Sequence, residues 1–172
     1  MAANALKTTA PCSSAEQVLA ALDAARERTL ALVAALAEQD LERVHSPIMS
    51  PLVWDLGHIA AYEDLWLGRR LGGMELLRPD LAECYDAFET PRAMRGEVDM
   101  LAAAQARAYM RAVRERVART LLRDGVGDGV ICEMVIRHEL QHTETMRQTL
   151  AIADLLASED RSRIDAPLCR MT

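Results

Sequence analysis

The chain has 172 residues, of which 51% are hydrophobic and 27% charged, with only 8 Gly and 6 Pro. This composition excludes a disordered tail, a collagen and a low-complexity linker, and the length suits one domain with its own core. Aromatic residues make up only 3%, and Ala and Leu supply most of the apolar content, which favours an all-α fold. The formal net charge of −6 argues against nucleic acid and anionic lipid as partners.

The N-terminal region shows no apolar signal segment. The longest apolar run, residues 30–37, is far shorter than the ~20 residues that a membrane span needs, so we expect no membrane partner. Cys12, Cys84, Cys132 and Cys169 are widely spaced and form no Cys-x-x-Cys pair. We therefore expect free thiols and a cytoplasmic location.

The first half of the chain predicts a leader and two helices. Residues 1–12 lack periodicity, and a domain is expected over residues 13–160, followed by a tail at 161–172. Ser13 and Glu16 predict a capping box for a first helix that ends near residue 39. Ser50 and Pro51 predict the cap and first turn of a second helix, which ends near residues 70–73.

The second half predicts a long connection and two further helices. Residues 72–97 hold three glycines and two prolines without a clean period. Further helices are expected at about 99–123, closed by Asp124-Gly125, and at about 128–158. Four helices of this length with one long central connection predict a four-helix bundle, in which metal sites form between facing helices.

The most informative segment is residues 137–145, Arg-His-Glu-Leu-Gln-His-Thr-Glu-Thr. His138 and His142 are four residues apart and so stand one above the other on a helix. Burying two imidazoles in a core of Ala and Leu is costly unless a metal binds them, so metal ligands are favoured over two core histidines. Both belong to a predicted inward stripe that also holds Ile131, Met134, Val135, Thr145, Thr149 and Ile152.

His58 is the natural third ligand, because it shares a helical face with Trp54 and Tyr62. Three neutral imidazoles leave open positions on a metal, as in catalytic sites. Imidazole suits iron, zinc, nickel and copper alike. His45 lies in a linker beside Ser46-Pro47 and is expected at the surface, away from the other three.

Residues 138–142 also fit the H-E-x-x-H pattern of zinc proteases, with Glu139 as general base. The extended pattern requires Gly and His where this chain has Thr145 and Gln148. No strand pattern exists to hold an extended peptide, so this alternative is disfavoured.

Two stretches together resemble a known family. Residues 49–60, Met-Ser-Pro-Leu-Val-Trp-Asp-Leu-Gly-His-Ile-Ala, and residues 138–146, His-Glu-Leu-Gln-His-Thr-Glu-Thr-Met, resemble signatures of the DinB-like N-terminal domain of ergothioneine-biosynthesis sulfoxide synthases. Residues 78–93 resemble the intervening loop of that family. The resemblance covers about residues 14–158 with three motifs in order.

The resemblance implies a DinB-like four-helix bundle in which His58, His138 and His142 bind iron(II), with zinc or nickel as other candidates. These oxidoreductases use oxygen to join the sulfur of γ-glutamylcysteine or cysteine to trimethylhistidine. Gln141 would lie near the imidazole substrate, and Arg92 and Arg95 would bind carboxylates of the low-molecular-weight thiol. The resemblance assigns no catalytic residue to this chain.

The family continues into a C-terminal domain that supplies a catalytic tyrosine, and nothing in this sequence corresponds to it. The expected partner is therefore a separate domain of that type or a second copy in a homodimer, and an open cleft bordered by Tyr85 to Arg95 is expected. Two alternatives remain. One is a stand-alone DinB-like metal-dependent thiol S-transferase, and the other is a non-enzymatic, metal-stabilised module that binds a partner.

Overall fold

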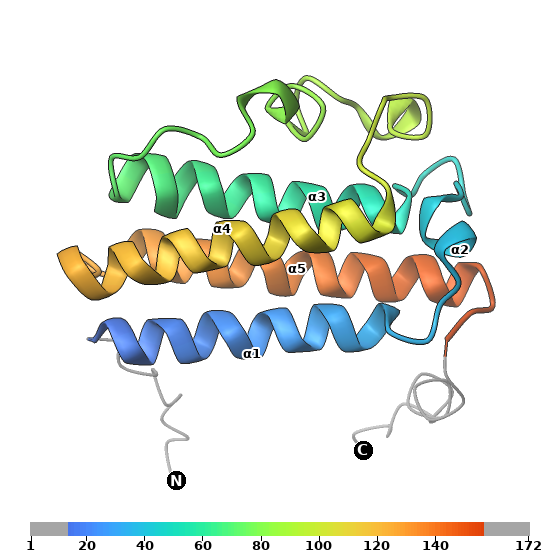
Figure 1. Cartoon of the computed structure of the whole chain (residues 1–172). Helices are drawn as coiled ribbons and strands as arrows, with labels where there is room; N and C mark the ends of the chain where they lie inside the picture. The colour runs from blue at the N-terminus through green and yellow to red at the C-terminus, as the bar shows by residue number, and fades with distance from the viewer. Residues whose placement is uncertain (1–13, 157–172) are drawn as a thin grey trace, which may run out of the picture.

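The computed structural model describes residues 14–156, and its regular secondary structure is all helical, with no strand in that range (Figure 1). The long elements are α1 (Ala15–Val33), α3 (Leu52–Glu63) with its π-helical continuation η1 (Asp64–Leu71), α4 (Ala103–Asp124) and α5 (Val130–Ile152). Shorter elements are α2 (Glu38–Glu42) and two 3₁₀ turns, η2 (Pro79–Leu81) and η3 (Arg92–Met94). The predicted all-α fold and helical bundle are confirmed.

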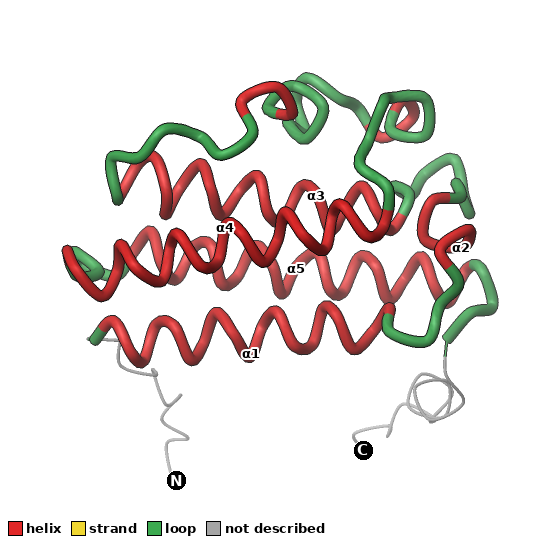
Figure 2. Tube along the Cα trace, in the orientation of Figure 1, coloured by secondary structure: helices red, strands yellow, loops and turns green. Residues whose placement is uncertain are grey.

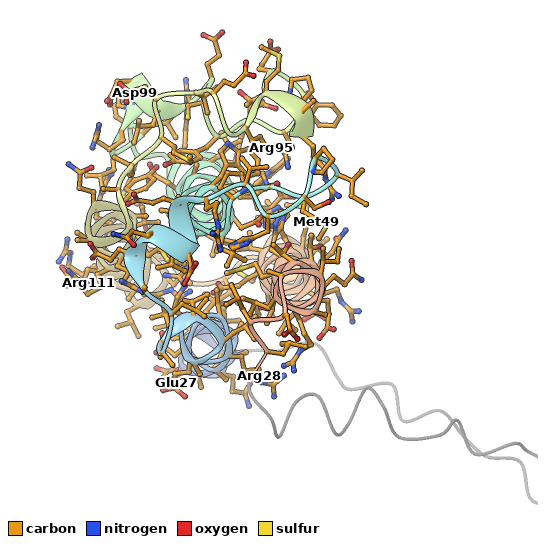
Figure 3. The ribbon with its side chains drawn as sticks, turned by 90° about the vertical axis from the view of Figure 1, so that its right-hand side faces the viewer. Glu27, Arg28, Met49, Arg95, Asp99 and Arg111 are labelled. Carbon is orange, nitrogen blue, oxygen red and sulfur yellow. The ribbon has the colours of Figure 1, made fainter. Side chains whose placement is uncertain are left out.

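The bundle contains two parallel pairs of neighbouring helices, α1 with α5 and α3 with α4, and the second pair explains the long connection. In Figure 1, α1 and α5 run in one direction while α3 and α4 run in the other. Because α3 and α4 are parallel neighbours, the chain must return along the whole bundle between them. The segment between η1 and α4 does so and lies over α3 (Figure 2). The end view in Figure 3 shows the four long helices around a common centre.

Two predicted helix starts are shifted by one residue. The cap of α1 is Ser14, whose Oγ accepts from the N–H of Gln17 at 3.2 Å, and the Gln17 side chain returns a bond to Ser14. The predicted cap, Ser13, lies outside the described residues. Pro51, not Ser50, caps α3, because the Ser50 hydroxyl instead accepts a hydrogen bond from Arg95 at 2.8 Å.

Of the other predicted boundaries, the end of the second helix near residues 70–73 agrees with η1, which ends at Leu71, and several others differ by more. The first helix ends at Val33, short of residue 39, and the turn that follows lets Leu41 of α2 reach the core. The third predicted helix, α4, starts at Ala103 and not near residue 99. It ends at Asp124 and is closed by Gly125 as predicted, where φ is +84°. The fourth ends at Ile152, while its predicted end, residue 158, lies outside the described residues.

The buried face of α5 is rotated from the predicted stripe. Glu139 and Thr143 are buried, at 1% and 5% exposure, while Ile152 is 54% exposed. His138 and His142 are half-buried at the border of this face. The predicted stripe left out Glu139 and Thr143, whose partners on α1 offset the cost of burial.

Two further expectations concern the whole chain. Among the helices of residues 14–156, none is both long and apolar enough to cross a membrane. Cys84 is a free thiol, as expected. Cys132 is buried, with its Sγ 3.9 Å from the carbonyl oxygen of Val126, and Cys12 and Cys169 lie outside the described residues.

Candidate metal centre

The structure brings together His58 of α3 and His138 and His142 of α5. One ring nitrogen from each lies within 4.8 Å of the other two, and Nε2 of His58 is 3.0 Å from Nε2 of His138. The sequence predicted this convergence from two helical faces 80 residues apart. His45 is elsewhere, beside α2, where its Nε2 is 2.7 Å from the carbonyl oxygen of Asp40.

The rings of His58 and His142 are each oriented by a hydrogen bond at Nδ1. Nδ1 of His58 is 2.7 Å from the carbonyl oxygen of Tyr85, and Nδ1 of His142 is 2.9 Å from Oδ1 of Asp55. A carbonyl and a carboxylate only accept, so each Nδ1 must carry the proton. The Nε2 of each neutral ring then keeps its lone pair for a metal, the arrangement usual for histidine ligands.

The spacing of the nitrogens suits one ion. Two metal–nitrogen bonds of about 2.1 Å at roughly 90° place the nitrogens about 3.0 Å apart, which matches the separation between His58 and His138. The widest separation, 4.8 Å, requires the third ring to move inward on binding. A set of three neutral nitrogen donors leaves further coordination positions open.

Burial favours the uncharged form of His58 and His138 near neutral pH. It lowers the pKa of His58 to about 4, and the nearby His142 acts in the same direction. Burial also lowers the pKa of His138 to about 2, again with His142 contributing. A metal binds the neutral form of imidazole, so these two rings do not have to lose a proton before they bind one at pH 7.

Aromatic side chains hold the ring planes. Trp54 stacks on His58 with centroids 4.8 Å apart, and Tyr62 stacks on His138 at 3.6 Å with an interplanar angle of 8°. The guanidinium of Arg95 lies 3.6 Å from the centroid of a Trp54 ring. The predicted face of Trp54, His58 and Tyr62 is therefore the face that turns to α5.

The predicted substrate-binding residues lie in different environments. Gln141 is exposed on α5, and Arg92 is exposed on η3, where its Nη1 donates to the carbonyl of Ile48 at 3.1 Å. Arg95 is only 5% exposed, between the connection and α3 (Figure 3). It donates to Thr90 O at 2.9 Å and to Ser50 Oγ at 2.8 Å, so it ties the connection to α3.

A surface pocket of about 660 Å³ lies along the connection and the start of α4. It takes in Glu89, Thr90 and Met94 from the stretch where an open cleft was expected. None of the three histidines lines it, so this pocket is separate from the candidate metal centre.

A buried ion cluster beside the centre was not predicted. Arg26 of α1 binds Glu63 at 2.7 Å and Glu139 at 2.8 Å, and Arg114 of α4 binds Glu63 at 2.7 Å. Glu139 also accepts from Thr29 of α1 at 3.0 Å. Its carboxylate is thus committed to α1, which does not suit the general base of a zinc protease. The sequence did hold one signal for this burial, because Arg26 lies four residues after Leu22 and so shares its helical face.

Asp55 is the second residue that the sequence reasoning missed. It is 1% exposed and contacts His142 across the helix interface. The signal was its position, because it is the only carboxylate within the otherwise apolar residues 51–61. A buried carboxylate at such a position indicates a specific partner.

Comparison with known proteins places the chain in a family. It is similar to three proteins named hercynine oxygenase, from Mycobacterium tuberculosis (strain ATCC 25618 / H37Rv), Mycolicibacterium smegmatis and Mycolicibacterium thermoresistibile. Identity is 45% over 141 residues, 44% over 136 and 46% over 132, or 80%, 76% and 73% of this chain. The matches cover 33%, 31% and 29% of the relatives, so the chain spans about a third of their length. The profile of the DinB superfamily matches residues 14–124, and the chain belongs to this superfamily.

Proposed function

We propose that this domain binds iron(II) through His58, His138 and His142 and forms the metal-binding part of a sulfoxide synthase of ergothioneine biosynthesis. The observation that carries the proposal is the convergence of the three rings together with the engagement of two Nδ1 atoms by acceptors. With Nδ1 protonated on both His58 and His142, the Nε2 lone pairs of these two rings share the same space. A metal ion removes the resulting repulsion.

Iron(II) in such a centre supplies open coordination positions and one-electron redox chemistry. Tyr85 and Asp55 orient the rings of His58 and His142, and Trp54 and Tyr62 shield one side of the centre. Buried aromatic walls also limit access of water to that side of the centre.

The proposed substrates are trimethylhistidine and a low-molecular-weight thiol, γ-glutamylcysteine or cysteine. The relatives' name supports the first, since hercynine is histidine trimethylated at its amino group. Gln141 is proposed to contact the imidazole substrate, and Arg92 and Arg95 the thiol's carboxylates. Arg92 is exposed and accessible, whereas Arg95 would have to exchange bonds that it now gives to Ser50 and Thr90.

A second component is part of the proposal. The similar relatives are about three times as long as the matched region, so each has further residues outside that region. We propose a separate domain or a second copy of this chain as the source of the remaining pocket wall.

The test is a metal titration of the chain purified without oxygen. Iron(II), nickel(II) and zinc(II) are titrated separately by calorimetry into the wild type and into His58→Ala, His138→Ala and His142→Ala. Each variant should lose most of its affinity yet keep its helical circular dichroism spectrum. His45→Ala is the matched control and should bind as the wild type does, because His45 contacts Asp40 instead.

The outcomes separate three functions. Iron(II) binding that is lost in each of the three histidine variants and kept in His45→Ala supports the proposal, although nickel(II) binds a nitrogen site more tightly than iron(II). Zinc binding with thiol transfer by the isolated chain would support an S-transferase in its place, and binding of no metal would leave a non-enzymatic partner-binding module.

A further inference from the structure

Asp55 lies in the most buried part of α3 and lacks the usual support of a buried carboxylate. Its Oδ1 accepts from Nδ1 of His142 at 2.9 Å. Its Oδ2 is buried and has no hydrogen-bond partner within residues 14–156. Burying a carboxylate with one hydrogen bond costs several kcal/mol unless positive charge is close. Asp55 therefore has a task beyond packing.

The groups around Asp55 indicate which side chain its carboxylate acts on. His142 is the only hydrogen-bond partner that the described residues offer it, and the contact joins α3 to α5. The guanidinium of Arg95 attracts the Asp55 carboxylate but gives its hydrogen bonds to Ser50 and Thr90 and lies over the Trp54 ring. Asp55 thus acts chiefly on one imidazole of the centre.

We propose that Asp55 is the positioning residue of His142. Its carboxylate fixes the proton on Nδ1, turns Nε2 toward His58 and His138, and adds one negative charge beside three neutral rings. The site as a whole then favours a divalent cation over a monovalent one. The part that concerns metal affinity rests on the proposed function, whereas the part that concerns the tautomer of His142 does not.

The two supported histidines differ in a way that makes the proposal specific. His58 is held by the main-chain carbonyl of Tyr85, which carries no net charge. His142 alone is held by a carboxylate. Charge is therefore supplied at one ligand only, and substitutions at position 55 can separate the effect of the charge from that of the acceptor.

Two variants make this separation. Asp55→Asn keeps an oxygen acceptor but removes the charge, and Asp55→Leu removes both. Nickel(II) is the probe, titrated by calorimetry at fixed pH. We expect a loss of affinity of about 10–100-fold in Asp55→Leu, with Asp55→Asn in between.

Asp64→Asn is the matched control. Asp64 is also 1% exposed, lies on the continuation of the same helix, and likewise has one buried oxygen without a hydrogen-bond partner in the described chain. Its other oxygen accepts from the N–H of Leu77, remote from the histidines. This variant should bind nickel(II) as the wild type does, whatever its stability.

The second measurement uses the metal-free protein. Nitrogen-15 NMR of the histidine rings should show His142 protonated at Nδ1 in the wild type and in Asp55→Asn, and mainly at Nε2 in Asp55→Leu. An unchanged His142 tautomer in Asp55→Leu, or an affinity equal to that of Asp64→Asn, would overturn the proposal. If the wild type bound no metal, the proposed function would fail, and the tautomer alone would decide the role of Asp55.

Discussion

Gly57 lies on α3 where Tyr85 of the connection packs, and its replacement by alanine tests how closely the two are fitted. A Cβ at position 57 would lie 2.2 Å from Cζ, 2.3 Å from Cε1 and 2.5 Å from Oη of Tyr85. Carbon atoms pack at about 3.5–4.0 Å, so the ring would have to move by roughly 1 Å or more. The same residue supplies the carbonyl that holds His58.

The magnitude follows from what surrounds the ring. Tyr85 is 2% exposed, and its hydroxyl oxygen accepts from the N–H of Leu101 at 2.9 Å. Overpacking costs about 2 kcal/mol, an unsatisfied Leu101 N–H adds about 2, and the better helix propensity of alanine offsets about 1. We expect Gly57→Ala to lower the free energy of unfolding by about 3 kcal/mol, or about 6–12 °C in Tm.

The assay is urea denaturation followed by circular dichroism for Gly57→Ala, Tyr85→Ala and the double variant. Once Tyr85 is truncated, the Cβ has room, so adding Gly57→Ala should raise stability by about 1 kcal/mol. The sign of the effect therefore reverses between the two backgrounds. A loss of equal size in both, or no loss beside the intact tyrosine, would refute the reasoning.

Other predictions concern the ion cluster, the metal and turnover. Arg26→Met leaves Glu63 and Glu139 buried with one cation fewer, so urea denaturation should show a loss of about 3–5 kcal/mol. Arg28→Met, on the exposed side of α1 (Figure 3), should stay within about 0.5 kcal/mol, and equal losses would contradict the role of the cluster. Nickel(II) at 100 times its Kd should raise the free energy of unfolding by about 2.7 kcal/mol, and His138→Ala should remove that gain. With iron(II), oxygen, γ-glutamylcysteine and trimethylhistidine but no second protein, the chain should form sulfoxide far more slowly than a complete synthase, because substrate positioning is incomplete; product from many turnovers would contradict this.

Periodicity was enough to find the three histidines, because residues four apart on a helix share a face whatever the rest of the fold does. The same rule located Trp54 and Tyr62 on the face of His58. Periodicity could not give the rotation of α5 about its own axis, since that rotation depends on where polar side chains find partners. The predicted inward stripe left out Glu139, which is buried because its carboxylate accepts a hydrogen bond from Arg26 on another helix.

Helix caps show the same limit at shorter range. Ser50 before Pro51 is a good local cap signal, but the Ser50 hydroxyl binds Arg95, 45 residues away. Asp55 is a similar case, because its partner is 87 residues distant. Local sequence gives the residue type at such positions, and the tertiary fold decides which of several available donors it meets.

The support of His58 by a main-chain oxygen has a consequence for how this centre tolerates change. Any amino acid at position 85 carries a carbonyl, so point substitution there leaves the acceptor of the His58 proton in place. Insertion or deletion of residues between η1 and α4 would instead shift that oxygen along the helix surface. The number of residues in the connection is therefore under tighter constraint than the identity of the residue that touches the histidine, and length variants of this segment should be rarer among functional descendants than its substitutions.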